Sequence, residues 1–253
     1  MLSSSSPQAA YSESAHVDGT AIAATTPEHR TCASASLDSL LARVGGTRRR
    51  VRRGEYLIRC GAPFQSVFGL RAGSFKTVLV TEDGREQVIG HHMAGEILGL
   101  ESVGGTTCCA DAVALEDSEV VDVAFAELDA LALRDPSLQR ELFRLLAAEI
   151  QRERGLMLLL GSMRAEERLA AYLINLSRRL ASHGWSATHF ILRMTREEIG
   201  SLLGLKLETV SRILSRFQAE GLISVRSREI AILEMEALKG VIGRTDGRRE
   251  QAD

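Results

Sequence analysis

The sequence is poor in cysteine, proline and aromatic side chains: its 253 residues include four Cys, four Pro and one Trp. No apolar run approaches the ~18 residues of a membrane-spanning helix. No basic segment followed by an apolar stretch opens the chain, as it would in a secretory leader. We therefore expect a cytoplasmic protein that does not contact a membrane.

Neither sign of charge dominates, because 31 Lys and Arg stand against 33 Asp and Glu. The balance conceals a difference between two parts of the chain. Residues 1–163 carry 16 basic and 21 acidic residues, whereas residues 164–253 carry 15 basic and 12 acidic residues. A mildly basic C-terminal third indicates an anionic partner there.

The four cysteines are Cys32, Cys60, Cys108 and Cys109. They form no C-x-x-C pair, and no Cys/His spacing is typical of a zinc site. The adjacent Cys108 and Cys109 cannot form a disulfide with each other without strain. We expect reduced thiols and no bound metal.

The residue pattern changes twice in the first part of the chain. Residues 1–31 are rich in Ser, Ala and Thr and predict a disordered tail. A short helix is expected at about 37–44, with Ser36 as its N-cap. Short apolar runs separated by glycine-containing turns follow, at 55–58, 67–70, 75–80, 87–89, 111–115 and 119–123. Strands at this spacing favour an antiparallel sandwich or barrel.

Helical periodicity then predicts a short helix at 125–134 and a long one at 136–162 with two apolar stripes. The first stripe, expected to lie against the sheet domain, contains Leu138, Leu142, Leu145, Leu156 and Leu159. The second has the alternating spacing of a coiled-coil seam and contains Phe143, Leu146, Ile150, Glu153, Met157 and Leu160.

A helix that is apolar on two faces needs two partners, so we expect a parallel homodimer through the second stripe. The alternative is one helix buried on most of its circumference within a single chain. Glu153 in such a seam would face its symmetry mate, and the repulsion would make the dimer conditional.

A helix at 164–183 precedes the segment with the most specific pattern. Thr195 and Glu198 form a capping box at the start of a helix over 196–203. Gly204 ends that helix, and a second helix over 208–220 follows the turn. Two short helices around a glycine-containing turn are typical of a helix-turn-helix.

Two short strands, 222–225 and 229–233, follow and are joined by a basic turn with Arg226 and Arg228. Together these elements predict a winged helix-turn-helix. The alternative is an ordinary helical hairpin. If the second helix enters the major groove of double-stranded DNA, its first turns read the bases.

The candidate base-reading residues are Glu208, Ser211 and Arg212, because Arg suits guanine and Glu accepts from cytosine. The candidate contacts to the DNA backbone are Thr195, Thr209, Arg216, Arg226 and Arg228. An i,i+4 ion pair on a solvated face is the alternative for Glu208 and Arg212.

This arrangement resembles the FNR/CRP superfamily of bacterial transcription regulators. The similarity is carried by segments 165–171, 175–179, 194–196 and 208–218, with Gly73, Glu86-Gln87 and 94–96 upstream. The resemblance implies an α+β fold in consecutive parts. These are a disordered tail (1–31), a β-roll sensor-like domain (32–135), a dimerisation helix (136–163), a winged helix-turn-helix (164–242) and a polar tail (243–253).

The resemblance also implies site roles. Glu208, Ser211 and Arg212 would read a TTGAT half-site in a palindrome. Glu82, Asp83, Arg85 and Glu86 would form a surface for RNA polymerase. Glu153 would match an acidic position of the FNR dimer helix.

The sequence departs from the family where sensing takes place. An FNR-type [4Fe–4S] cluster takes closely spaced N-terminal cysteines and one in the roll, but only Cys32 lies near the N-terminus and Val121 takes the roll position. A cyclic AMP pocket uses an Arg-Ser pair where this chain has residues 107–110 without arginine. We expect neither cofactor.

The resulting hypothesis is a DNA-binding regulator, most simply an activator, in oxygen- or redox-linked gene control. Its input could be abundance, thiol oxidation at Cys108 or Cys109, or haem or nitric oxide. His91 and His92 are candidate ligands, with ordinary residues at the end of a strand as the alternative. A nucleotide- or haem-responsive regulator of the same superfamily is the alternative. A cupin-type enzyme would need a metal triad that the sequence lacks, and a protein-contact signalling module would lack DNA binding.

Overall fold

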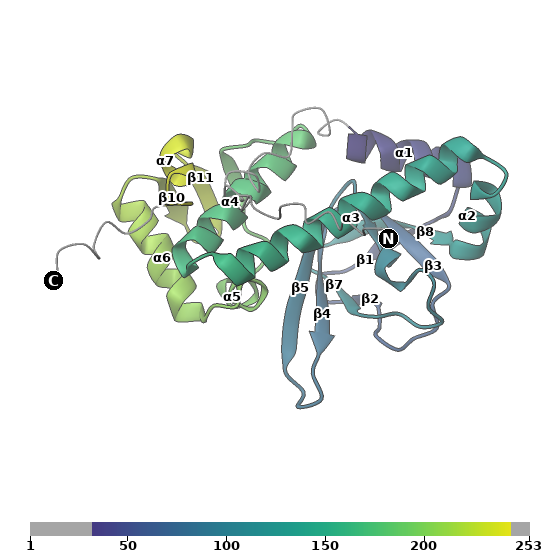
Figure 1. Cartoon of the computed structure of the whole chain (residues 1–253), viewed down its shortest axis with the longest axis horizontal. Coiled ribbons are helices and arrows are strands. Elements are labelled where there is room, and N and C mark those ends of the chain that lie inside the picture. Colours follow the sequence, from purple (N-terminus) through teal and green to yellow (C-terminus); the bar gives the residue numbers. More distant parts are fainter. Residues whose placement is uncertain (1–31, 244–253) are drawn as a thin grey trace, which may run out of the picture.

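The computed structural model describes residues 32–243, with side chains from Leu37 onward. The expected tail at 1–31 and residues 244–253 of the polar tail lie outside the described residues. The chain forms a β-roll, a long helix and a C-terminal domain (Figure 1). No helix in the described range is long and apolar enough to cross a membrane.

The roll contains two antiparallel four-stranded sheets, in the orders β1-β8-β3-β6 and β2-β7-β4-β5. The strands are β1 (Thr47–Val51), β2 (Tyr56–Ile58), β3 (Ser66–Ala72), β4 (Ser74–Val80), β5 (Glu86–Met93), β6 (Ile97–Leu98), β7 (Asp111–Ala114) and β8 (Ser118–Ala124). A short 3-10 helix, η3 (Leu100–Ser102), follows β6. This confirms the expected antiparallel architecture. The sequence did not reveal β1, because only its last residue is buried, nor β6, which has two residues.

Alternating side chains of the two sheets meet in the roll's interior. Phe75 of β4 and Leu70 of β3 are fully buried there with Leu98 and Val120. Burial of one face of each sheet is what gives the strands their alternating pattern in sequence.

Helices cover one end of the roll. α1 (Cys32–Val44) and α2 (Phe125–Ala132) pack with the start of α3 (Pro136–Ser162) through Leu37, Leu128 and Leu138. The expected start of α1 was wrong: the helix begins at Cys32, so Ser36 lies inside it and is not its N-cap. Asp135 caps α3 by accepting from the amides of Ser137 and Leu138.

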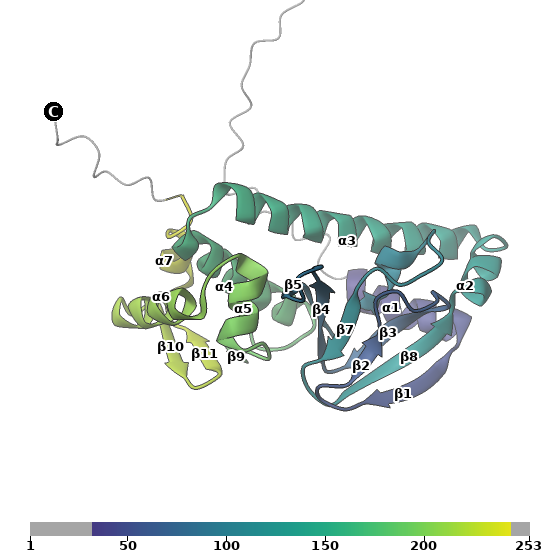
Figure 2. The ribbon, with the colours of Figure 1, turned by 90° about the horizontal axis from the view of Figure 1, so that it is seen from below.

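The long helix α3 runs along both the roll and the C-terminal domain (Figure 2). Leu138, Leu142 and Leu145 pack on the roll side, as expected. Leu156 and Leu159 instead join a cluster made mostly of C-terminal residues. The expectation that they lie against the sheet domain was wrong, because the chain reverses after α3 and places α4 beneath its last turns.

The C-terminal domain contains α4 (Ala165–Ser182), β9 (His189–Ile191), α5 (Arg196–Leu203), α6 (Leu207–Ala219), β10 (Ile223–Arg226), β11 (Glu229–Ile232) and α7 (Met235–Lys239). Its sheet has the order β10-β11-β9. The sequence reading missed β9 and α7, which are three and five residues long.

The hairpin of β4 and β5 touches the C-terminal domain directly. Lys76 Nζ lies 2.8 Å from Glu198 Oε1, and the Val88 amide donates to Ser201 Oγ at 2.9 Å. Burial raises the pKa of Glu198, but the hydrogen bonds from Lys76 and the Thr195 amide outweigh it and hold that pKa below its usual range. The first helix of the helix-turn-helix therefore rests on the roll.

Candidate nucleic-acid interface

The capping box at the start of α5 is present as predicted. Thr195 Oγ1 accepts from the Glu198 amide at 3.1 Å, and the Thr195 amide donates to Glu198 Oε2 at 2.7 Å. Two free amides of the first turn are thereby satisfied. The same Glu198 also pairs with Lys76, which the sequence reading did not foresee.

The turn after α5 depends on close backbone approach. Gly204 adopts the left-handed conformation, with φ 64° and ψ 38°. The Leu205 amide donates to the Gly200 carbonyl at 2.8 Å. A Cβ at position 200 would lie 2.6 Å from the Leu205 carbonyl oxygen, so only glycine fits this contact.

The second helix, α6, is strongly two-sided. Val210, Ile213, Leu214 and Phe217 are buried and anchor it to the domain core. Glu208 and Arg212 are exposed, while Thr209 and Ser211 are half-buried. Within the described residues no ion pair joins Glu208 to Arg212, so the alternative of a solvated i,i+4 pair is not what the structure contains. Both side chains are free to meet base edges.

Besides Thr195, which is bonded to Glu198, two predicted DNA contacts on α6 already have protein partners. Ser211 Oγ accepts from Arg196 Nη1 at 3.3 Å. Arg216 Nε donates to Glu220 Oε1 at 2.7 Å, and Arg216 also forms an ion pair with Glu166 of α4. The hydrogen bond that Arg216 donates to Glu220 and the charge of the nearby Glu166 raise the pKa of Arg216. Two carboxylates of the protein therefore already neutralise the positive charge of Arg216 in the absence of DNA.

The wing is a hairpin in which Arg226 opposes Glu229. Ser227 adopts a left-handed conformation with φ 58°, unusual for a residue other than glycine, and this closes the turn. Arg226 is exposed at the tip. Arg228 is half-buried, and its carbonyl accepts from the Leu192 amide at 2.8 Å. The strand β9 thus supports the wing from the side away from α6.

The predicted dimer seam is divided by the structure. Phe143, Ile150 and Met157 of α3 are 59%, 48% and 72% exposed, and Glu153 is exposed beside them. Leu146 and Leu160 are half-buried against the roll and the C-terminal domain respectively. Four of the six residues therefore form an open face, while two contribute mainly within the chain.

The turn between β4 and β5 carries the expected charged residues at the end of a projecting hairpin (Figure 1). Arg85 Nη2 lies 2.6 Å from Asp83 Oδ2. Hydrogen bonds from Thr81 and Arg85 hold the pKa of Asp83 below its usual range. Since Asp83 and Arg85 compensate each other, Glu82 and Glu86 give the tip its acidic character.

The described cysteines cluster loosely on the roll. Cys60 and Cys109 are exposed and Cys108 is half-buried. Cys60 Sγ donates to the Cys109 carbonyl at 3.3 Å. Burial and the nearby Glu101 raise the pKa of Cys108, which is contrary to the lowered pKa that a redox-sensing thiol needs. No group of potential metal ligands gathers among residues 32–243.

Two sequence families match consecutive parts of the chain. Residues 48–135 match the family described as "Cyclic nucleotide-binding domain", which coincides with the roll and α2. Residues 167–241 match the family described as "Crp-like helix-turn-helix domain", which coincides with α4 to α7. The first match ends just before α3 in the sequence, and the second begins after it.

Several curated proteins are similar over most of their length. The transcriptional regulatory protein Btr of Bordetella pertussis is 47% identical over 194 residues, covering 77% of this chain and 80% of Btr. The transcriptional activator protein Anr of Pseudomonas aeruginosa is 43% identical over 208 residues, covering 82% of this chain and 84% of Anr.

The solved structure of FixK2 from Bradyrhizobium japonicum has the same architecture. It superposes with a TM-score of 0.73 at 31% identity, covering 79% of this chain and 98% of FixK2. The superposition with FixK2 thus spans the antiparallel roll, the long helix and the helix-turn-helix. The chain belongs to the CRP/FNR family of transcription regulators.

Proposed function

We propose that the chain is a homodimeric, non-enzymatic transcriptional activator that reads a TTGAT-like palindrome. The exposed face of α6 carries this proposal. Glu208 and Arg212 lie one turn apart on a helix whose opposite face is fixed by Val210 and Phe217. A rigid helix with free polar ends is what base reading in the major groove requires.

The open face of α3 supports the homodimer. Phe143, Ile150 and Met157 follow each other at spacings of seven residues and are all exposed in the single chain. Burial of such a row of apolar residues against a second copy stabilises the dimer. Glu153 lies in the same row and weakens the contact through like-charge repulsion.

The tip of the β4–β5 hairpin is the proposed contact for RNA polymerase. Glu82 and Glu86 are exposed there, and the hairpin itself projects from the rest of the molecule (Figure 1). A projecting acidic turn remains accessible when the helix-turn-helix is on DNA. The activator role is further supported by the similarity to Anr, which is itself named a transcriptional activator.

The proposed role is in oxygen- or redox-linked gene control, by a protein that needs no resident iron–sulfur cluster or cyclic AMP. The residues of the roll do not fit a cyclic phosphate: residues 107–110 supply no cation, and Glu96 is already paired with Arg152 and Arg179. The cysteines do not fit an FNR-type cluster either, because Val121 of β8 stands where the roll cysteine would be.

DNA binding by protein purified without oxygen tests this function. The probe is a TTGAT–N4–ATCAA duplex, measured before and after exposure to air, with iron and sulfide determined on the same sample. Salt-sensitive binding that prefers this duplex over a scrambled one supports the proposal. Equal affinity for both duplexes would contradict sequence-specific DNA binding. Bound iron that is lost in air at the same time as DNA binding would contradict the absence of a resident cofactor.

A further inference from the structure

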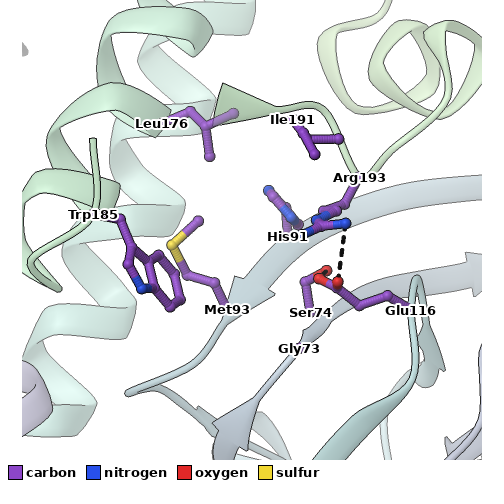
Figure 3. Close-up of a pocket in the computed structure, with 9 residues that line it drawn as sticks. All are labelled: Gly73, Ser74, His91, Met93, Glu116, Leu176, Trp185, Ile191 and Arg193. Atoms are coloured by element: carbon purple, nitrogen blue, oxygen red, sulfur yellow. Dashed lines mark hydrogen bonds and ion pairs between the residues drawn. The ribbon is translucent and has the colours of Figure 1, made fainter. Parts of the chain in front are cut away.

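The pocket between the roll and the C-terminal domain is lined by charged and hydroxyl groups that already have protein partners (Figure 3). Arg193 Nη1 lies 3.1 Å from Glu116 Oε2, and Ser74 Oγ donates to Glu116 Oε1 at 2.8 Å. The ring nitrogens of His91 are buried and closed to any occupant of the pocket. Accessible reactive groups lie instead on the far part of the roll, where its cysteines gather.

Two cysteines from distant parts of the sequence lie side by side there. Cys60 follows β2, and Cys109 precedes β7. Cys60 Sγ donates to the Cys109 carbonyl at 3.3 Å, although the two residues are 49 positions apart. Both residues are exposed, and neither belongs to the DNA-reading face of α6 or to the exposed face of α3. Both thiols are therefore open to a reagent in solvent.

The backbone fixes the two cysteines opposite each other. The Gly61 amide donates to the Cys108 carbonyl at 2.9 Å, and the Cys108 amide donates to the Ala62 carbonyl at 2.8 Å. Gly61 and Ala62 thus together oppose Cys108, as in a β-bulge, and the next facing pair is Cys60 with Cys109. Facing residues of antiparallel segments have Cα atoms about 4.5–5.5 Å apart. A disulfide spans about 4.4–6.8 Å between Cα atoms, so this pairing suits one.

The third described thiol, Cys108, is placed differently. It is half-buried and packs against the apolar core of the roll. Successive side chains of an extended segment point to opposite sides, which leaves Cys109 on the outer side. Burial and the nearby Glu101 raise the pKa of Cys108, so little of it is thiolate near pH 7. The thiolate is the reactive form of cysteine, and Cys108 is therefore the least suited of the three to react.

Cys109 also connects the thiol pair to the long helix. Its amide donates to Ser102 Oγ at 3.1 Å, and its Sγ donates to the Glu101 carbonyl at 3.7 Å. Both acceptors belong to η3. Leu100 of η3 packs in one apolar cluster with Leu138 of α3. A change at Cys109 is thereby transmitted to a segment that supports α3.

We propose that Cys60 and Cys109 form a reversible disulfide by exchange with a low-molecular-weight disulfide such as oxidised glutathione. One cysteine thiolate attacks the reagent, forms a mixed disulfide and releases one glutathione. The other cysteine thiolate attacks the protein sulfur of that mixed disulfide, forms the Cys60–Cys109 bond and releases the second glutathione. The protein loses two hydrogen atoms and two electrons, and the two glutathione thiols gain them.

The disulfide has a consequence for the dimer. Its formation turns the Cys109 sulfur from the Glu101 carbonyl toward Cys60, so η3 loses one of its two hydrogen bonds to Cys109. We expect the weaker support of α3 by η3 to weaken the homodimer. This consequence rests on the proposed homodimer, whereas the disulfide itself does not.

Oxidised glutathione, added to the reduced full chain in native buffer, tests the disulfide. Intact mass shows the loss of two hydrogen atoms, and dithiothreitol should restore them. Tryptic peptides mapped without reduction identify the link, because Cys60 lies in the peptide 60–71. Cys108 and Cys109 share the peptide 86–134, so C108S is needed to assign the link to Cys109.

We expect peptides 60–71 and 86–134 to be linked in the unsubstituted chain and in C108S, and not in C60S or C109S. Because a cross-link restricts the unfolded chain, oxidation should also raise the melting temperature, and C60S should lack this rise. A chain that stays reduced, or that keeps glutathione on either cysteine, would overturn the disulfide. A link through Cys108 or Cys32 would overturn it as well.

Sedimentation equilibrium of the reduced and the oxidised chain tests the consequence for the dimer. We expect oxidation to raise the dimer dissociation constant at least threefold, and to leave that of C60S unchanged. An unchanged constant in fully oxidised protein would overturn the coupling while the disulfide stands. If the reduced chain is monomeric, the proposed homodimer fails, and the peptide map still decides the disulfide.

Discussion

Arg179 of α4 places its Nη2 atom 2.9 Å from both carboxylate oxygens of Glu96 in the roll. Arg152 of α3 reaches the same carboxylate at 2.8 Å. One buried carboxylate therefore connects the roll, the long helix and the DNA-binding domain. Burial raises the pKa of Glu96, but the two guanidinium groups outweigh it and keep the carboxylate ionised.

Replacing this carboxylate should loosen the domains from one another. E96Q leaves two arginines facing a neutral amide, and breaking a buried ion pair in this way typically costs about 3–5 kcal/mol. We expect a clear drop in the free energy of unfolding, measured by urea denaturation. E119Q is the control, because Glu119 lies 3.8 Å from an exposed Arg48 and such surface pairs contribute about 0–1 kcal/mol. Equal effects would contradict the connecting role of Glu96.

The free energy of unfolding should fall as the pH drops below the pKa of a free histidine side chain. Burial lowers the pKa of His91 and of His92 to about 3, with Glu96 opposing and Arg152 and Arg179 adding to the shift. Because the unfolded chain binds these protons near pH 6.5, the stabilisation is complete above that pH and is lost progressively below it.

The slope is at most about 1.4 kcal/mol per pH unit for each histidine. Glu96 adds loss in the same direction below its unfolded pKa of about 4.3. Urea denaturation at pH values between about 6.5 and 4.3 measures this dependence of stability on pH. H91F should reduce its slope. A stability that does not change over this range would show that the imidazoles are not neutral and buried in solution.

Arg212 should carry specificity at one base pair. R212A is expected to cost roughly 1–3 kcal/mol on the cognate palindrome and to relax the preference for one guanine. R226A is the comparison, because an exposed wing arginine that meets phosphate should weaken all sequences about equally. Fluorescence anisotropy with single-substituted duplexes measures both. Unchanged base preference in R212A would show that the assigned face of α6 does not read DNA.

Glu153 should limit dimer strength. Glu153 lies between Ile150 and Met157 in the exposed row of α3. E153A removes the repulsion between Glu153 and its counterpart in the second copy and is expected to tighten the dimer, as measured by sedimentation equilibrium. F143A deletes an exposed ring from the same row and should weaken it. If E153A leaves the dissociation constant unchanged while F143A weakens the dimer, Glu153 does not face its counterpart.

Gly200 should be required for the turn of the helix-turn-helix. G200A places a methyl group 2.6 Å from the Leu205 carbonyl oxygen, and the forced shift should cost roughly 1–3 kcal/mol. G161A is the matched control, since a Cβ at Gly161 of α3 meets nothing within 4 Å and should gain about 0.5–1 kcal/mol. Thermal unfolding followed by circular dichroism compares the two.

Features that depend on neighbours in sequence were determined by the sequence alone. The Thr195–Glu198 capping box, the apolar face of α6, the limits of α3 and most roll strands follow from local hydrogen bonding and from periodicity. These signals are read within a turn or a strand. The start of α1 was misjudged because Ser36 is a good cap in isolation but not where the helix continues to Cys32.

Only the tertiary structure decided which distant side chains meet. Arg216 pairs with Glu166, which is 50 residues away, and Arg179 finds Glu96 across 83 residues. The two ring nitrogens of His91 are buried without a hydrogen-bond partner among the described residues. No pattern in sequence encodes these contacts, because they arise where separately folded elements pack. Which arginines remain free for DNA is therefore a property of the assembled fold.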